Sequence, residues 1–140
     1  MPPPVPRPTR LPTFIYRLPT PDDGNWETEL SRRHARNEMI REELQAGQPV
    51  VYRSSGWSLF PRVHSNDATY YVPVTKEEDV SVGDIVFCQV EPGLRYYAHL
   101  ISKKEWYNDK WWYTITNIKG HRNGWADIEH IYGRLENCWH

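Results

Sequence analysis

Five segments after Pro49 constrain the fold more than any other feature, because each has the composition of a β-strand. They are rich in valine, isoleucine and aromatic residues, which favour extended backbone. Clusters of Gly, Pro, Asn, Asp and Lys separate them, as is typical of turns. The segments span residues 50–53, 69–74, 84–90, 95–101 and 111–117. The sequence therefore predicts an antiparallel β-domain over residues 48–140.

The residues before this β-domain divide into a tail and one helix. Residues 1–24 contain eight prolines, which rule out a helix or a central strand and predict an extended tail. Asn25 is a good N-cap, and apolar residues then recur at helical intervals as far as Leu44. Gly47 is a typical helix terminator. Residues 25–47 are therefore predicted to form an α-helix.

The charge and the hydropathy of the chain argue against several broad classes of protein. The formal net charge of the 140 residues is −1, so no global field draws the chain to nucleic acid or to an acidic membrane surface. No run approaches the roughly 20 apolar residues that span a bilayer, and the proline-rich start lacks the apolar centre of a secretory signal. The chain is therefore expected to be soluble, in a compartment that the sequence leaves open.

The cysteines and histidines do not indicate a metal site. Cys88 and Cys138 form no CxxC pattern, and Cys88 is expected to be a buried strand thiol, which weakly favours a reducing compartment. The remaining histidines outside the helix show no metal-ligand spacing. They are His64, His121, His130 and His140. No metal and no other cofactor is therefore expected.

Residues 54–61, Ser-Ser-Gly-Trp-Ser-Leu-Phe-Pro, combine a turn with a candidate nucleophile. The small residues predict a turn that presents Ser58 between bulky neighbours, and Pro61 then stops regular structure. A serine hydroxyl reacts at neutral pH only when a base accepts its proton. His99, in Tyr-Tyr-Ala-His-Leu-Ile, is the candidate base because an imidazole titrates near neutrality.

Five short boxes follow one another over residues 48–135. They are Ser-Gly-Trp-Ser-Leu-Phe-Pro (55–61), Val-Ser-Val-Gly-Asp-Ile-Val (80–86), Tyr-Ala-His-Leu-Ile (97–101), Lys-Gly-His-Arg-Asn-Gly (119–124) and Ile-Tyr-Gly-Arg-Leu (131–135). In this order they resemble the serine peptidase superfamily that contains type I signal peptidases and LexA-like self-cleaving repressors. The resemblance implies a mainly β fold, an antiparallel β-ribbon or partly open barrel, here preceded by one helix and the Pro-rich tail.

The resemblance also implies a catalytic site. Ser58 matches the nucleophile, and His99 matches the base of the endoplasmic-reticulum and archaeal signal peptidases, where histidine replaces the bacterial lysine. Asp127 is the matching carboxylate that would orient His99. Ser55 and Gly56 would position the oxyanion or the substrate, with the Ser58 N–H and the Ser55 hydroxyl as donors.

The chain departs from the pattern of this superfamily at three places. Leu100 stands where an arginine commonly follows the histidine. Leu59 stands where methionine is usual, which is a volume-conserving change. The pair His121-Arg122 stands where the Gly-Asp-Asn-like box has Asp-Asn, and this removes an acidic residue from the neighbourhood of the base. Ala46-Gly47 is similar to the bond at which LexA-like proteins cleave themselves, although helix termination also explains Gly47.

The residues leave three functions open. The first is a serine endopeptidase that binds an extended peptide or protein substrate by strand addition and cleaves it. The second is an inactive member of the fold that binds proteins in a large assembly through residues 1–22 and surface aromatics. The third is nucleic-acid binding by residues 95–122, where basic and aromatic residues interleave. Nucleic acid is the least expected partner, because the rest of the chain offsets this local charge.

Overall fold

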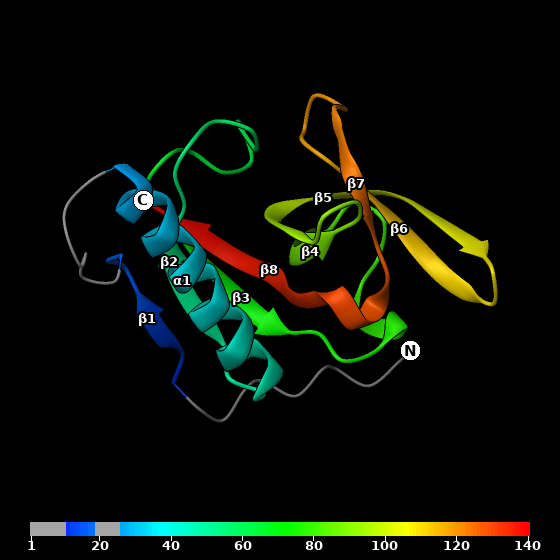
Figure 1. Ribbon diagram of the computed structural model, residues 1–140, viewed down its shortest axis with the longest axis horizontal. Coiled ribbons are helices and arrows are strands. Elements are labelled where there is room, and N and C mark those ends of the chain that lie inside the picture. The colour runs from blue at the N-terminus through cyan, green and yellow to red at the C-terminus, as the bar shows by residue number, and fades with distance from the viewer. Residues whose placement is uncertain (1–10, 19–25) are drawn as a thin grey trace.

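The computed structural model describes residues 11–18 and 26–140 (Figure 1). In chain order the strands are β1 (Thr13–Ile15), β2 (Val50–Arg53), β3 (Ala68–Pro73), β4 (Ile85–Val90), β5 (Arg95–Tyr107), β6 (Lys110–Thr116), β7 (Arg122–Ala126) and β8 (Ile131–Trp139). The α-helix is α1 (Trp26–Gln45), and two 3₁₀ helices, η1 and η2, span Glu77–Asp79 and Ile128–His130.

All the described strands belong to one sheet in the order β1-β2-β3-β8-β4-β5-β6-β7. β1 and β7 form its two edges, so the sheet is not closed into a barrel. β1 runs parallel to β2, whereas the neighbouring pairs from β2 to β7 are antiparallel. The predicted fold class, mainly β with one preceding helix, is confirmed.

Part of the predicted tail contributes a strand. Residues 13–15 pair in register with residues 50–52, and the Thr13 N–H donates to the Pro49 carbonyl at 2.8 Å. Ile15 is buried in the core. Because β1 lies at the edge of the sheet, it needs hydrogen bonds on one side only, which a proline-rich segment can supply. Residues 1–10 and 19–24 of the predicted tail, and the predicted N-cap Asn25, lie outside the described residues.

The predicted helix is confirmed as α1, and Gly47 ends it as expected. Gly47 has a φ of +83°, and its N–H donates to the Leu44 carbonyl while the Gln48 N–H donates to the Glu43 carbonyl. This pair of hydrogen bonds is a Schellman motif. Ile40 and Leu44 are fully buried, whereas Leu30, another of the apolar residues at helical intervals, is largely exposed. The C-terminal half of α1 therefore supplies its buried contacts with the sheet.

Gly133 of β8 makes room for this packing. A Cβ at position 133 would lie 2.8 Å from Cδ1 of Leu44. α1 therefore approaches the sheet closely where β8 has no side chain, and Figure 1 shows the helix lying across β2, β3 and β8.

The predicted strand segments correspond to β2, β3, β4, β5 and β6, and their starts differ from the prediction by at most one residue. β5 extends further than predicted, to Tyr107, and forms with β6 a long hairpin that projects from the rest of the molecule (Figure 1). β7 was not predicted. β8 was expected only as the closing strand over residues 131–135.

β4 is the centre of the core, since all six of its residues are buried. Phe87 faces one cluster of buried side chains together with Leu44 and Tyr71. Val86 and Cys88 face the other cluster, which Tyr113 also joins. Cys88 is fully buried, as predicted, and burial raises the pKa of its thiol. Among the described residues there is no helix with the length and apolar character that crossing a membrane requires.

Candidate active site

The loop between β2 and β3 carries Ser58. Hydrogen bonds close the base of this loop: the Ser54 N–H donates to the Asp67 carbonyl at 3.1 Å, and the Asn66 N–H donates to the Ser54 carbonyl at 2.7 Å. Within the loop, Leu59 and Val63 are buried in the core and are joined by a hydrogen bond from the Val63 N–H to the Leu59 carbonyl. These anchors hold Ser58, which is itself exposed, at a fixed place on the surface.

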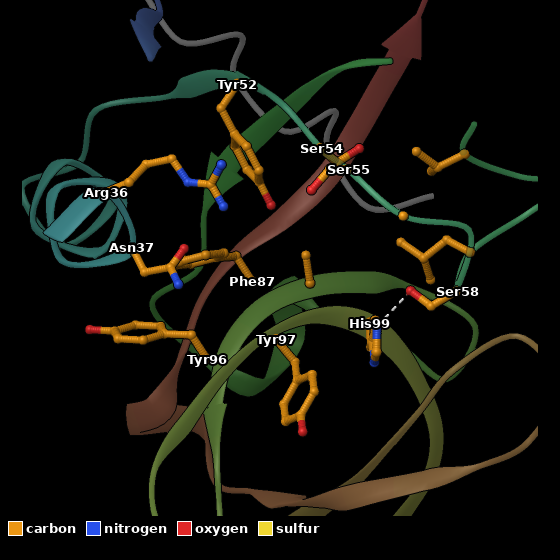
Figure 2. Close-up of a pocket in the computed structure, with 14 residues that line it drawn as sticks. Arg36, Asn37, Tyr52, Ser54, Ser55, Ser58, Phe87, Tyr96, Tyr97 and His99 are labelled. Atoms are coloured by element: carbon orange, nitrogen blue, oxygen red, sulfur yellow. Dashed lines mark hydrogen bonds between the residues drawn. The ribbon is translucent and has the colours of Figure 1, made fainter. Parts of the chain in front are cut away.

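Ser58 lies beside His99. The distance from Ser58 Oγ to His99 Nε2 is 2.9 Å, a normal hydrogen bond (Figure 2). His99 is on β5, and its position is fixed because it pairs with Val86 of the buried strand β4. The Ile118 N–H donates to the Ser58 carbonyl at 3.1 Å and ties the turn after β6 to the same loop. The structure thus brings together the two residues predicted to be nucleophile and base.

Asn123 orients His99. Its Oδ1 lies 2.6 Å from His99 Nδ1. An amide oxygen only accepts hydrogen bonds, so this contact assigns the ring proton to Nδ1 and leaves Nε2 as the acceptor for the Ser58 hydroxyl. Ser58, His99 and Asn123 therefore form one hydrogen-bonded chain with the proton positions that nucleophilic catalysis requires.

His99 is held largely in its neutral form. Burial lowers its pKa, the hydrogen bond to Asn123 opposes that effect, and the charge of His121 lowers the pKa further. The net result is a pKa below the ordinary value for histidine. Neutral imidazole is the form that accepts a proton, so the environment favours a base at neutral pH.

Asp127 is not placed as the sequence suggested. Its Oδ2 lies 2.8 Å from Lys110 Nζ, and its Oδ1 lies 2.7 Å from His130 Nδ1. Burial raises the pKa of Asp127, but the contacts with these two basic side chains outweigh burial, and the net pKa is lowered. Both oxygens of the buried carboxylate are thus engaged at the start of η2, and Asn123 takes the position beside His99 that Asp127 was expected to hold.

A β-bulge places Asn123. In the pairing of β6 with β7, Ile115 lies opposite Gly124 and Thr116 lies opposite Arg122, so Asn123 is the extra residue. Bulges re-aim side chains in this way. The Gly-His-Arg-Asn-Gly box contained Asn123, and its amide side chain next to a glycine was the available signal. The sequence pointed to Asp127 instead because a carboxylate was expected in this role.

Gly124 is needed for this arrangement. Its φ is +154°, and a Cβ there would lie 2.2 Å from the carbonyl oxygen of Glu91. The close approach arises because Glu91 and Trp125 exchange two backbone hydrogen bonds, of 2.7 and 3.1 Å. A residue with a side chain would separate these backbones, so glycine fixes the position of Asn123 relative to β4.

Ser55 and Gly56, predicted to position the oxyanion or the substrate, line the same cavity as Ser58, but only Ser55 offers a free donor group. The Gly56 N–H donates to Ser65 Oγ at 3.2 Å and so supports the loop. Within the described part of the chain, the Ser55 hydroxyl and the Ser58 N–H have no hydrogen-bond partner. They remain available to stabilise negative charge on a reacting carbonyl.

A cavity of about 180 Å³ opens next to the Ser58–His99 pair. Figure 2 shows the pair at one end of the cavity and α1, with Arg36 and Asn37, at the other. Ser54 and Ser55 lie on one side, and Tyr96 and Tyr97 of β5 lie on the opposite side. The cavity therefore lies between the serine-rich β2–β3 loop and strand β5, and it is open to a substrate.

The outer part of the β5–β6 hairpin, residues 103–113, carries the aromatic and basic side chains, and none of these residues lines the cavity. Its lysines contact its own tryptophans: Lys104 Nζ is 4.4 Å from the centre of the Trp111 ring, and Lys110 Nζ is 4.5 Å from that of Trp112. These cation–π contacts use ring faces on which bases would otherwise stack. Trp106 and Tyr107 near the tip are exposed.

A scan against protein-family models finds no model that matches this chain, and a search among curated proteins finds no relative. The chemistry open to the site is therefore judged from its side chains. Nucleophile, base and orienting residue in one hydrogen-bonded chain are the arrangement found in hydrolases that form an acyl-enzyme, including those with asparagine as the third member.

Proposed function

We propose that this protein is a serine endopeptidase with Ser58 as nucleophile, His99 as general base and Asn123 as the positioning residue. The observation that carries the proposal is the 2.9 Å contact between Ser58 Oγ and His99 Nε2 beside an open cavity. The resemblance of the five boxes to signal peptidases and LexA-like proteins supports the same chemistry.

The reaction follows from the proton positions. Ser58 Oγ attacks the carbonyl carbon of a peptide bond while Nε2 of His99 accepts the hydroxyl proton. The tetrahedral intermediate collapses when His99 returns this proton to the leaving amine, which breaks the C–N bond and leaves an ester on Ser58. Water, deprotonated by His99, then attacks the ester carbonyl, and the acid is released as the bond to Ser58 Oγ breaks and His99 returns the proton to that oxygen. Asn123 holds the ring in one tautomer during both steps.

A free strand edge supports peptide binding at this site. β6 pairs with β5 only from Leu100 onward, whereas β4 pairs with β5 from Arg95. Residues 95–99 therefore have β4 on one edge and no strand on the other among the described residues. An extended peptide can hydrogen-bond to such an edge, and here its carbonyl groups would pass close to Ser58.

The test is labelling by a serine-directed, peptide-like acylating probe, read by intact mass. Wild type should gain one adduct, and Ser58→Ala and His99→Ala should gain none. Ser81→Ala is the matched control, because this serine is exposed on a turn outside the cavity and should not affect labelling. Absence of labelling on folded wild type, or equal labelling of Ser58→Ala, would count against the proposal.

Binding without cleavage is the second candidate. Trp57 and Phe60 lie on either side of Ser58 in the loop, and they are 61% and 47% exposed. Exposed aromatic side chains of this kind are enriched at protein interfaces. If the protein only binds partners, Trp57→Ala should weaken partner binding while Ser58→Ala leaves the binding affinity unchanged and no acyl adduct forms.

A further inference from the structure

The cavity beside Ser58 has a single permanent charge. Among the described residues that line it, Arg36 carries the only such charge, and no aspartate or glutamate is present. We propose that this cavity recognises an acidic side chain of the peptide substrate and that Arg36 binds its carboxylate, an inference that rests on the proposed peptidase function. Arg36 would then be the residue that determines specificity.

Arg36 lacks an acidic partner in the described part of the chain. Arg41 on the same helix pairs with Glu38, and Arg134 on β8 pairs with Glu136. Arg36 instead lies over the ring of Tyr52, with its guanidinium carbon 5.6 Å from the ring centre. Its Nε is buried and has no hydrogen-bond partner. A partly buried cation without a counter-charge gains free energy when a carboxylate arrives.

Glu38, the acidic residue closest to Arg36 along α1, binds other side chains. Glu38 binds Arg41, accepts a hydrogen bond from the Tyr96 hydroxyl at 2.6 Å, and lies 3.5 Å from His34. The charge of Arg36 is therefore not neutralised by Glu38. Figure 2 shows the guanidinium directed away from α1 and lying beside the ring of Tyr52.

The uncharged polar groups of the cavity suit a carboxylate as well. Asn37 carries an amide that can donate two hydrogen bonds, and the Ser54 hydroxyl can donate one. Phe87 and Ala98 supply apolar surface between these donors and Ser58. The methylene groups of a glutamate close to the scissile bond can lie on this surface while its carboxylate reaches Arg36.

The test uses pairs of peptides that differ only by glutamate or the isosteric glutamine at one position near the cleaved bond. For wild type, we expect kcat/KM to be about tenfold or more higher with glutamate at one position, which corresponds to about 1.4 kcal/mol. Arg36→Gln should remove this preference, and Arg36→Lys should restore part of it. Arg33→Gln is the matched control, since Arg33 is an exposed cation about one turn before Arg36 on α1 and does not line the cavity.

Binding to the Ser58→Ala variant separates this inference from the proposed function. The same peptides, fluorescently labelled, are titrated with Ser58→Ala and with Ser58→Ala/Arg36→Gln. Cleavage by wild type with equal rates for glutamate and glutamine at every position overturns the inference and leaves the peptidase standing. Absence of cleavage together with glutamate-selective binding that requires Arg36 supports the inference and removes the peptidase. Neither cleavage nor selective binding overturns both.

Discussion

Asn123 Oδ1 contacts His99 Nδ1 at 2.6 Å although the strands that carry these residues, β7 and β5, are separated in the sheet by β6. The contact is possible because β6 ends at Thr116, which pairs with Leu100 on one side and with Arg122 on the other. His99 lies one residue beyond the last β5–β6 pair, and Asn123 is the bulge residue beside the last β6–β7 pair. The end of β6 and the bulge in β7 together bring these two side chains into contact.

Substitution of Asn123 tests this orienting role. Asn123→Ala should reduce the rate of acylation by the serine-directed probe about tenfold or more, because the imidazole loses its fixed tautomer and direction. Asn123→Asp should restore the hydrogen bond and add a negative charge, which raises the pKa of His99. An NMR titration of the His99 ring protons measures this pKa. A purely structural role predicts equal acylation by Asn123→Ala and no change of the His99 pKa in Asn123→Asp.

The pH dependence of acylation should reflect the lowered pKa of His99. In the proposed mechanism neutral His99 accepts the proton, so activity should persist below about pH 6.5, the ordinary pKa of histidine, and decline only as the pH falls through the lower folded-state pKa. His121→Gln removes one cause of the lowering and should move the acidic limb to higher pH. The profile of probe labelling against pH measures both effects.

His130→Gln is the control for this shift. His130 contacts Asp127 and does not contribute to the pKa of His99. The acidic limb of the labelling profile of His130→Gln should coincide with that of wild type. A limb that stays in place in His121→Gln, or that moves equally in both variants, contradicts the assignment.

Gly124→Ala should destabilise the fold. The added Cβ would meet the Glu91 carbonyl oxygen at 2.2 Å, and this oxygen cannot easily move aside because two backbone hydrogen bonds hold Glu91 to Trp125. We expect the free energy of unfolding to fall by about 2 to 4 kcal/mol, as measured by urea denaturation. Gly120→Ala is the control, because Gly120 also has a positive φ, +93°, but has open space around it, so the substitution should cost only about 1 kcal/mol. Equal effects of the two substitutions would show that the clash at Gly124 is relieved.

The sequence was sufficient for elements whose side chains alternate between core and surface or follow a helical period. Residues 50–53 were predicted without error because three of the four are buried and β-favouring. The extension of β5 was missed because residues 102–107 are all exposed, so no hydrophobic pattern marks them as a strand. β7 was missed because Arg-Asn-Gly reads as a turn, whereas pairing with β6 and with Glu91 makes it a strand.

Sequence reasoning found the Ser58–His99 pair because both residues lie in recognisable boxes. It could not find the third member by the same route, since the orienting contact depends on a bulge and on the end of β6. Both features arise from pairing between strands that the pattern of single residues does not specify. The sequence did not predict that Arg36 lines the cavity, for a related reason. The helical pattern indicates only that α1 packs on the sheet, whereas the contact of α1 with β8 is what brings Arg36 to the cavity.

The contacts of Asp127 indicate that this residue stabilises the fold and does not take part in catalysis. Asp127→Ala removes a buried carboxylate that binds Lys110 and His130, so the free energy of unfolding at pH 7 should fall by about 1 to 3 kcal/mol. The folded-state pKa of Asp127 is lowered, so its contribution is present above the unfolded pKa and is lost as the pH falls through the folded value. The difference between wild type and Asp127→Ala should therefore shrink below about pH 4, the unfolded value. Acylation of Ser58 should stay within about twofold of wild type, because the residue does not contact His99. A tenfold loss of acylation in the folded variant would instead return Asp127 to the catalytic site.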